Sequence, residues 1–463
     1  MKFAVLNGSP KGDKSITLQY VRYLEKFYPE HEYAVQNVAQ KIRALEKNDG
    51  SFHEVIDSVR GADGVIWSFP LYFLLVHAGL KRFIELIGER DVVEAFSQKY
   101  AVGISTSIHF FDHTAHTYIH GISEDLGMRY VSSFSPHMMD LMEEEGREKL
   151  RFFAESFFDA VERGATMPRR NRPITPVTLT YSPGAVDGKI GTGGKRVAVV
   201  TDARPGDDNL NGMIGRFTRA LSGDVEVLNL GDVEIKGDCQ GCIQCGYDFT
   251  CAYEGKDGFI DFYRDKVMTA DAVIFASTIR DRYLSADIKR MFDRMFFQTH
   301  TPRHSKKQIG FLVSGPLSQL PNLREIMEGF FQVEEGNLVD MISDEYDDSE
   351  TLDAVIDDFA RNIMRAADSE YIRPLDFLGV GGRKIFRDDM YAGLKFPFRA
   401  DHRHYKENGY YDFPHKNYKM RILSGVMSAL AVFPPMREEI YKRRIRGEMV
   451  KPFMKIVERV DAK

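Results

Sequence analysis

The chain has 463 residues, of which 43% are hydrophobic and 28% are charged, and its formal net charge is −6. This composition excludes disordered, fibrous and membrane-embedded chains, and a chain of this length is expected to fold into two or three domains. The mild acidity argues against a nucleic-acid binder. We therefore expect small-molecule partners, with neither nucleic acid nor membrane among them.

The first six residues already have the pattern of a strand and lack the cleavage site of a secretory signal. The longest apolar stretch, residues 422–435, is shorter than the roughly 20 residues that a spanning helix needs. All four cysteines lie between Cys239 and Cys251, which favours ligation over a disulfide scaffold. These features predict a cytoplasmic protein.

Short β-branched runs alternate with amphipathic helical stretches in both halves of the chain, a pattern typical of βαβ units. The strands expected in the first half are residues 2–7, 32–38, 64–69, 100–106 and 129–134. Those expected in the second half are residues 196–202, 225–230, 272–277, 308–314 and 337–342. The sequence predicts an α/β fold with two tandem flavodoxin-like, doubly wound, parallel five-stranded sheets, each with its ligand site beyond the carboxyl ends of the strands.

The two halves are similar to one another in sequence. Lys81 in an LKRF run corresponds to Lys289 in an IKRM run at an offset of 208 residues, whereas Val5 corresponds to Val199 at an offset of 194. The second half therefore carries 14 extra residues in the interval that also contains the cysteines. We expect the cysteine loop to be an insertion on a duplicated scaffold.

The predicted domains are residues 1–167 and 196–370, joined by a linker at 168–195 and followed by a helical C-terminal extension at 371–463. The extension contains 20 Lys and Arg against 11 Asp and Glu, a balance of +9, which leaves −15 for the preceding residues. We expect it to lie against acidic surface of its own chain or of a second copy in a homo-oligomer. A basic arm for a membrane surface or a nucleic acid is the alternative.

A loop rich in hydrogen-bond donors, residues 7–17, follows the first strand and opens a helical run. Backbone N–H groups and the positive end of the helix meet there, Ser9, Ser15 and Thr17 add hydroxyls, and Lys11 adds positive charge. The loop has neither the triphosphate-loop ending nor the dinucleotide glycine spacing. It predicts a site for a monophosphate ester, with a serine-capped hydrophilic turn as the alternative.

The third strand ends in an aromatic loop, residues 67–73, at the same edge of the sheet. An apolar wall near a phosphate site suits a flat cofactor such as FMN. With these two loops and the run at 80–84, the sequence resembles the NADPH-dependent FMN reductase and iron-sulfur flavoprotein family over both domains. In such reductases a second subunit often completes the flavin pocket, and a tandem repeat can supply that subunit in cis.

The resemblance implies that the hydroxyls of the first loop hold the phosphate, that the aromatic loop lines the isoalloxazine, and that residues 105–110 close over its polar edge. The implied cofactor-binding residues are Ser9, Lys11, Ser15, Ile16, Thr17, Pro70, Leu71, Tyr72, Phe73, Ser105, Thr106, Ser107, His109 and Phe110. His109 and Tyr72 are the candidate catalytic residues.

Four histidines, His109, His113, His116 and His120, are spaced 4, 3 and 4 residues apart, which places them along one face of a helix. Such a row of imidazoles can bind a metal. Contact of His109 with flavin or substrate and a purely structural face are the other interpretations.

The cysteines Cys239, Cys242, Cys245 and Cys251 are spaced 3, 3 and 6 residues apart, a compact arrangement that can surround a cubane cluster. The run resembles that of iron-sulfur flavoproteins, which implies a 4Fe-4S cluster. Redox thiols without a ligand and a zinc site are the alternatives.

The second domain's own phosphate loop, residues 201–211, contains three aspartates, which repel a phosphate and argue against a second FMN.

The predicted function is an FMN-dependent oxidoreductase of the NAD(P)H-dependent flavin or quinone reductase type. Electrons pass from NAD(P)H through FMN to a small acceptor, or to or from the cluster. In this chemistry the protein contributes positioning and electrostatics. The alternatives are a ferredoxin-linked iron-sulfur flavoprotein that carries electrons and a non-enzymatic redox sensor that binds flavin or zinc.

Overall fold

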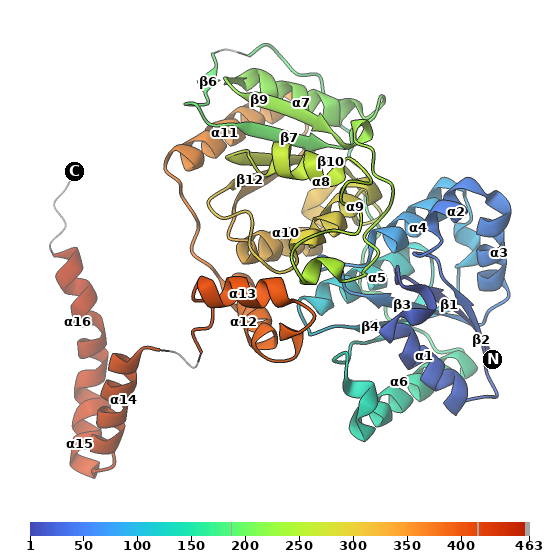
Figure 1. The fold of residues 1–463 in the computed structure, drawn as a ribbon, viewed down its shortest axis with the longest axis horizontal. Coiled ribbons are helices and arrows are strands. Elements are labelled where there is room, and N and C mark those ends of the chain that lie inside the picture. The colour runs from blue at the N-terminus through green and yellow to red at the C-terminus, as the bar shows by residue number, and fades with distance from the viewer. Residues whose placement is uncertain (187, 414–415, 459–463) are drawn as a thin grey trace. The chain divides into compact units, whose positions relative to one another are not determined.

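The computed structural model describes residues 1–186, 188–413 and 416–458. One compact unit ends at Tyr405, and the residues after it form a second unit. The first unit contains both sheets (Figure 1).

The first sheet has five parallel strands in the order β2-β1-β3-β4-β5. The strands are β1 (Lys2–Asn7), β2 (Glu32–Gln36), β3 (Gly64–Pro70), β4 (Tyr100–Thr106) and β5 (Arg129–Phe134). Its helices are α1 (Ile16–Phe27), α2 (Ile42–Lys47), α3 (Asp49–Arg60), α4 (Ala78–Glu89), α5 (Asp112–Asp125) and α6 (Glu144–Glu162). This strand order is that of flavodoxin-like folds, as predicted.

The second sheet repeats the order as β9-β7-β10-β12-β13, again parallel along this path. The strands are β7 (Val197–Thr201), β9 (Val225–Asn229), β10 (Ala272–Arg280), β12 (Gln308–Ser314) and β13 (Asn337–Ser343). Its helices are α7 (Asp208–Ala220), α8 (Phe259–Phe262), α9 (Ala286–Arg294), α10 (Pro321–Val333) and α11 (Ser349–Asp368). The short strands β6 (Ile190–Gly191) and β8 (Leu221–Ser222) pair with each other outside this sheet.

All ten predicted strands are present, and the differences lie at their ends. β10 continues to Arg280, three residues beyond the predicted end, because it turns back into an antiparallel partner, β11 (Tyr283–Leu284). β2 ends at Gln36, whose carbonyl accepts a hydrogen bond from Val38 N at 2.9 Å and so turns the chain.

Helices cover both faces of each sheet, which makes both faces apolar. Alternate residues of β1 show this: Phe3 and Val5 belong to the core under α1 and α6, whereas Ala4 and Leu6 belong to the core under α3, α4 and α5. In the second sheet α7 and α11 cover one face, and α8, α9 and α10 cover the other.

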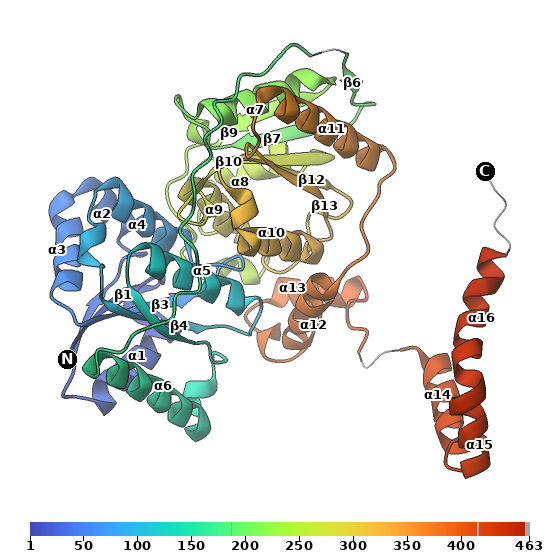
Figure 2. The same cartoon turned by 180° about the vertical axis from the view of Figure 1, so that it is seen from behind.

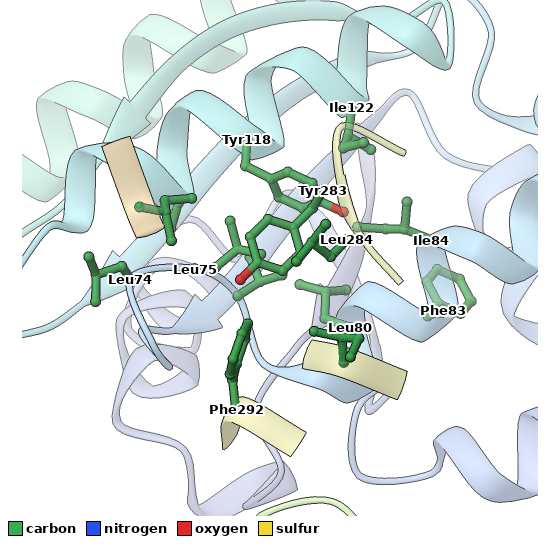
Figure 3. Close-up of a cluster of buried hydrophobic side chains, with 14 of the residues drawn as sticks. Leu74, Leu75, Leu80, Phe83, Ile84, Tyr118, Ile122, Tyr283, Leu284 and Phe292 are labelled. Carbon is green, nitrogen blue, oxygen red and sulfur yellow. The ribbon is translucent and has the colours of Figure 1, made fainter. Parts of the chain in front are cut away.

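One of these cores is shared by the two repeats. Figure 3 shows Tyr283 and Leu284 of β11 and Phe292 of α9 among side chains of α4 and α5. The rings of Tyr118 and Tyr283, one from each repeat, lie 6.4 Å apart at the centroids. The repeats are therefore joined by a continuous apolar core, with α4 and α9 in contact at its centre.

Charged groups of α9 bind the first repeat inside this interface. Asp293 Oδ2 accepts a hydrogen bond from the backbone N–H of Ala78, at the start of α4, at 2.6 Å. Lys289 pairs with Asp293 and donates to the carbonyl of Tyr72 at 3.0 Å. Both charged side chains are fully buried.

Charged groups of α4 bind the second repeat in the same way. Glu85 Oε1 accepts from the backbone N–H of Ala286, at the start of α9, at 2.8 Å and from Lys81 Nζ at 2.8 Å. Lys81 Nζ also lies 3.7 Å from Asp281 Oδ2. The two hydrogen bonds at the helix starts and the two lysine–carboxylate pairs correspond at an offset of 208 residues, so this part of the interface has the reciprocal form of a two-fold symmetric dimer within one chain.

The C-terminal extension is helical, as predicted. Its helices are α12 (Phe377–Tyr391), α13 (Arg399–Glu407), α14 (Tyr418–Leu430), α15 (Pro434–Glu438) and α16 (Ile445–Val457). α12 packs against α10 of the second repeat, and both views show them together (Figures 1 and 2). No helix among the described residues is long and apolar enough to cross a membrane.

We expect Asp293→Ala to lower the free energy of unfolding by about 3 to 5 kcal/mol, because it leaves the buried Lys289 ammonium without its partner. Urea unfolding measures the change. The exposed pair Glu145 and Lys149 of α6, with the same i,i+4 spacing and 2.6 Å between Nζ and Oε1, is the matched control. Glu145→Ala should change stability little, and an equally small effect of Asp293→Ala would contradict this account of the interface.

Candidate functional site

The loop at residues 7–17, which is predicted to hold a phosphate, joins β1 to α1, and its hydroxyl groups are buried. Ser9, Ser15 and Thr17 are each no more than 2% exposed. Ser15 caps α1 by accepting a hydrogen bond from Leu18 N, so the free N–H groups of the first helical turn lie beside it. Thr17 Oγ1 lies 2.7 Å from Thr106 Oγ1 at the end of β4, which ties this loop to the loop after β4.

The loop after β3 is a strained hairpin turn. Tyr72 and Leu75 pair across it, and Phe73 and Leu74 between them have φ values of 43° and 57°, in the left-handed region. Such conformations cost about 1 to 3 kcal/mol each and persist where the surroundings impose them. The bond from Lys289 to the Tyr72 carbonyl is one such constraint, so the interface between the repeats shapes this loop.

Both loops open into one cavity of about 380 Å³, a size typical of small-molecule sites. All the predicted cofactor-binding residues line it except Ser105 and His109. The lining residues from the first repeat are Ser9, Lys11, Ser15, Ile16, Thr17, Pro70, Leu71, Tyr72, Phe73, Leu74, Thr106, Ser107, Ile108, Phe110 and Met138. Of these, Leu74 and Met138 were not predicted, and Ile108 was predicted only as part of the loop 105–110.

Ser105 and His109 lie behind or beside the cavity wall. Ser105 is fully buried, and its Oγ lies 2.8 Å from Nε2 of His116. His109 has a φ of 63°, and its Nδ1 lies 3.0 Å from Asp112 Oδ2 with about half of the side chain exposed. The contact with Asp112 therefore holds the His109 ring outside the lining.

The histidines of the predicted row each have a separate partner. His109, His113 and His120 pair with Asp112, Glu325 and Glu124, respectively. Burial lowers the pKa of His116 to about 4, so its imidazole is neutral at pH 7. No group of three or more His, Cys, Asp or Glu side chains within residues 1–186, 188–413 and 416–458 is arranged to hold a metal ion.

The second repeat supplies the opposite wall of the cavity. Its lining residues are Gly241, Ile243, Phe296, Thr299, His300, Phe330, Val333 and Glu334. The sequence predicts a wall supplied in cis, but it does not identify these residues. Gly241 and Ile243 lie within the cysteine run, and the others come from loops and helices without a recognisable motif. The 208-residue correspondence locates α9, and Phe296 to His300 follow that helix directly.

His300 has unusual surroundings within this wall. Its ring lies 4.4 Å from that of Phe386 and 4.5 Å from that of Phe398, and Nδ1 is buried without a hydrogen-bond partner among the described residues. Burial lowers the pKa of His300. The backbone N–H of His300 donates to Asp401 Oδ1 at 2.8 Å, and the Thr299 hydroxyl donates to Asp401 Oδ2 at 2.6 Å.

Asp401 belongs to α13, so the C-terminal extension fixes the conformation of the His300 loop. The extension also closes the cavity directly with Phe386, Leu394, Pro397 and Phe398. The sequence gives no signal for this role, because the extension has no counterpart in the repeat. The cavity is therefore built from three parts of the chain.

The four cysteines line a second, small cavity of about 20 Å³, together with Arg294, Tyr253 and the wall residues Gly241, Ile243 and Phe296. Those three wall residues also line the larger cavity, so the two cavities share a wall. A Cβ at Gly241, whose φ is +59°, would lie 2.1 Å from Tyr72 Oη. The cysteine loop can approach Tyr72 this closely because position 241 is glycine.

The surroundings of the thiols are apolar and partly cationic. Burial raises the pKa of Cys239 and Cys251 and raises that of Cys245 to about 12, and nearby cysteines add to each shift. Arg294 pairs with Asp257 at 2.8 Å, but its Nε is buried and has no partner in the described part of the chain. Thiolates are the usual ligands of iron-sulfur clusters, but as they stand in this structure the four described thiols are not arranged to hold a metal ion.

Burial, with the nearby carboxylate of Asp293, raises the pKa of Tyr72 well above its usual range. Tyr72 therefore remains a neutral hydroxyl at the boundary between the two cavities. Its ring packs edge-on against that of His77, with centroids 4.9 Å apart, and His77 Nε2 lies 2.8 Å from the Cys239 carbonyl oxygen.

The equivalent loop of the second repeat has different residues from the loop at 7–17. Gly8 corresponds to Asp202 at the offset of 194, and Asp202 accepts a hydrogen bond from Ser285. Burial raises the pKa of Asp202. A cavity of about 200 Å³ near this loop is lined by charged side chains, Arg204 and Arg280 among them, where the first repeat has aromatic ones.

The sequence profile of the NADPH-dependent FMN reductase family matches residues 1–136 and 209–333, which together make more than half of the chain. The chain belongs to this family, and the match in two segments agrees with the tandem duplication. It is accordingly an FMN-dependent NAD(P)H oxidoreductase. None of the curated proteins matches the chain.

Several solved structures are similar to about a third of the chain. They include the NAD(P)H:acceptor oxidoreductase FerB from Paracoccus denitrificans (18% identity, 35% of this chain and 97% of that one, TM-score 0.30). An azoreductase from Bacillus anthracis has 15% identity over 38% of this chain and 99% of its own, with a TM-score of 0.29. General stress protein 14 from Treponema denticola, in complex with FMN, has 11% identity over 35% and 98%, with a TM-score of 0.27.

Proposed function

We propose that one FMN binds in the cavity between the repeats and that this enzyme passes electrons from NAD(P)H to a small acceptor such as a quinone or a free flavin. The observation that carries the proposal is the polarity of the cavity. Buried hydroxyls and Lys11 lie at the loop before α1, whereas the remaining walls are mostly apolar and aromatic. A phosphate suits the first part and a flat ring suits the second.

Bound FMN supplies hydride and single-electron chemistry, and the chain supplies binding, orientation and exclusion of water. Ser9, Ser15 and Thr17 would hold the phosphate, with Lys11 balancing its charge. The apolar side chains of Pro70 to Phe73 would line the ring. Phe296, Phe386 and Phe398 restrict the access of water from the opposite side.

Tyr72 is our candidate catalytic residue, because it lines the cavity and keeps a neutral hydroxyl next to the cysteine loop. The predicted catalytic role of His109 remains a prediction, and the structure places its ring beside Asp112. A cytoplasmic location and a homo-oligomer remain predictions as well.

We also propose that Cys239, Cys242, Cys245 and Cys251 hold a 4Fe-4S cluster. The four thiols surround one cavity, and the unpaired Nε of Arg294 offers a hydrogen bond to an anionic ligand. The present cavity has room for about one water, so the thiols must move apart to admit a cluster. Because the two cavities share a wall, a one-electron partner such as ferredoxin is a second candidate electron donor or acceptor.

We expect Ser9→Ala to weaken FMN binding about 10- to 100-fold, because a hydrogen bond to a charged group contributes roughly 1.5 to 3 kcal/mol. Quenching of flavin fluorescence on titration of the apoprotein measures the affinity. Ser277 is equally buried, lies within β10 of the second repeat, and does not line the cavity. Ser277→Ala should leave the affinity unchanged, and equal effects of the two substitutions would refute the assigned phosphate site.

Anaerobically purified protein should contain about four irons per chain, measured by iron and zinc assays with an absorption spectrum. The variant Cys239→Ser/Cys242→Ser should contain almost no iron and should retain FMN. Thr250→Ala, in the same loop, should keep its iron. An iron-free wild type, or one that contains zinc instead, would remove the cluster from the proposal.

A further inference from the structure

Residues 416–458, which we call the basic hairpin, expose an unusual amount of apolar surface. Here α14 is followed by α15, a π-helix at Glu439–Arg444 and α16. The exposed large hydrophobic side chains are Tyr418, Met420, Ile422, Leu423, Val426, Met427, Val432, Phe433, Met436, Tyr441, Val450, Phe453, Met454, Ile456 and Val457. Most of them are more than half exposed.

This surface is concentrated in a small part of the chain. The basic hairpin has fifteen exposed large hydrophobic residues, whereas the rest of the described chain, about ten times as long, has twelve. Those twelve are scattered over several elements, α1, α6, β9 and α12 among them. Contiguous exposed apolar surface in a folded protein marks a site of interaction with a partner or a membrane.

The apolar side chains of α14 occupy one broad face. Ile422 and Val426, and likewise Leu423 and Met427, are four residues apart and therefore lie next to one another along the helix. Arg421, Ser424 and Ser428 occupy the opposite side of the helix. An apolar face opposed to a polar face is the pattern of helices that lie at an interface.

The charges of the basic hairpin are placed at both ends of this face. Residues 422–436 contain no Asp, Glu, Lys or Arg. Lys416, Lys419 and Arg421 precede this run, and Arg437 and the cluster 442–444 follow it. Residues 416–458 contain 10 Lys and Arg against 4 Asp and Glu, a balance of +6, while residues 1–370 carry −15.

We propose that the basic hairpin binds the surface of an anionic lipid bilayer. The uncharged run is too short to span a bilayer, but its length suits a segment that lies in the interface. The flanking cations are then in position to contact anionic headgroups, which attract basic segments beside an apolar one. This inference differs from the expectation of no membrane partner, which rested on the overall composition and charge and on the length needed for a spanning helix.

A second copy of the chain is the rival occupant. Its acidic body complements the charge of the basic hairpin, but the exposed large hydrophobic residues in the described part of that body are fewer and are distributed over several elements. A bilayer surface meets both requirements, because it offers negative charge and an apolar interior together. The observations therefore favour lipid.

Flotation of the full-length protein with vesicles tests the proposal. We expect binding to phosphatidylcholine vesicles that contain phosphatidylserine, little binding to phosphatidylcholine alone, and weaker binding at raised salt. Two double variants test the two parts of the surface, Ile422→Ser/Val426→Ser and Lys419→Glu/Arg421→Glu. Each should lower the affinity for the phosphatidylserine vesicles by a factor of about ten or more. They should keep the FMN content of the wild type, because these side chains are outside the cavity.

Phe152→Ser in α6 is the control, because Phe152 is 73% exposed and lies outside the basic hairpin. It should bind vesicles as the wild type does. Equal binding to both kinds of vesicle, or equal loss in the control, would overturn the proposal. Absence of binding, with a dimer that the two hairpin variants abolish, would assign this surface to a second copy instead.

Discussion

The contact between α4 and α9 places the two repeats together, and the site depends on it. Each helix presents a lysine and a carboxylate to the other repeat, and each carboxylate accepts a hydrogen bond from the backbone N–H at the start of the opposite helix. These charges are buried, so removing one partner leaves an uncompensated charge in an apolar core. The constraint is geometric as well, because hydrogen bonds at a helix start require one register between the two helices.

That register places the cysteine loop and the residues after α9 opposite the first repeat's loops, across the cavity that both line. Lys289 reaches from the interface to the carbonyl of Tyr72, in the strained turn that lines the cavity. The duplication therefore supplies in one chain what a symmetric dimer supplies with two. It also permits asymmetry: the first repeat keeps a loop of hydroxyls, whereas the second has Asp202 and an insertion that contains every cysteine.

The strands and the strand order could be predicted from the sequence, because each strand is a short, nearly continuous apolar run buried on two faces. Most of the first repeat's lining could also be predicted, since the residues follow strand ends at one sheet edge. His109 was named with them, but its contact with Asp112 places the ring outside the lining. A local sequence pattern does not show whether such a side chain will face the cavity or will contact a neighbouring side chain instead.

The remaining walls could not be predicted for the same reason. Phe296, His300 and Phe398 lie far along the chain from the loop at residues 7–17. They line the cavity because α4 and α9 are in contact and because Asp401 accepts hydrogen bonds from the His300 loop. Lys81 and Lys289 do align in the sequence repeat, but a sequence alignment does not show that their helices face each other. Only the folded arrangement connects the duplication to the cavity.

The number of FMN molecules bound by each chain tests the central claim most directly. Titration of the apoprotein with FMN, followed by flavin fluorescence and checked by absorbance after removal of free ligand, measures this stoichiometry. The account predicts one FMN per 463-residue chain, in the cavity that the first repeat opens and the second repeat and extension close. Two FMN per chain, or none in a well-folded protein, would contradict it.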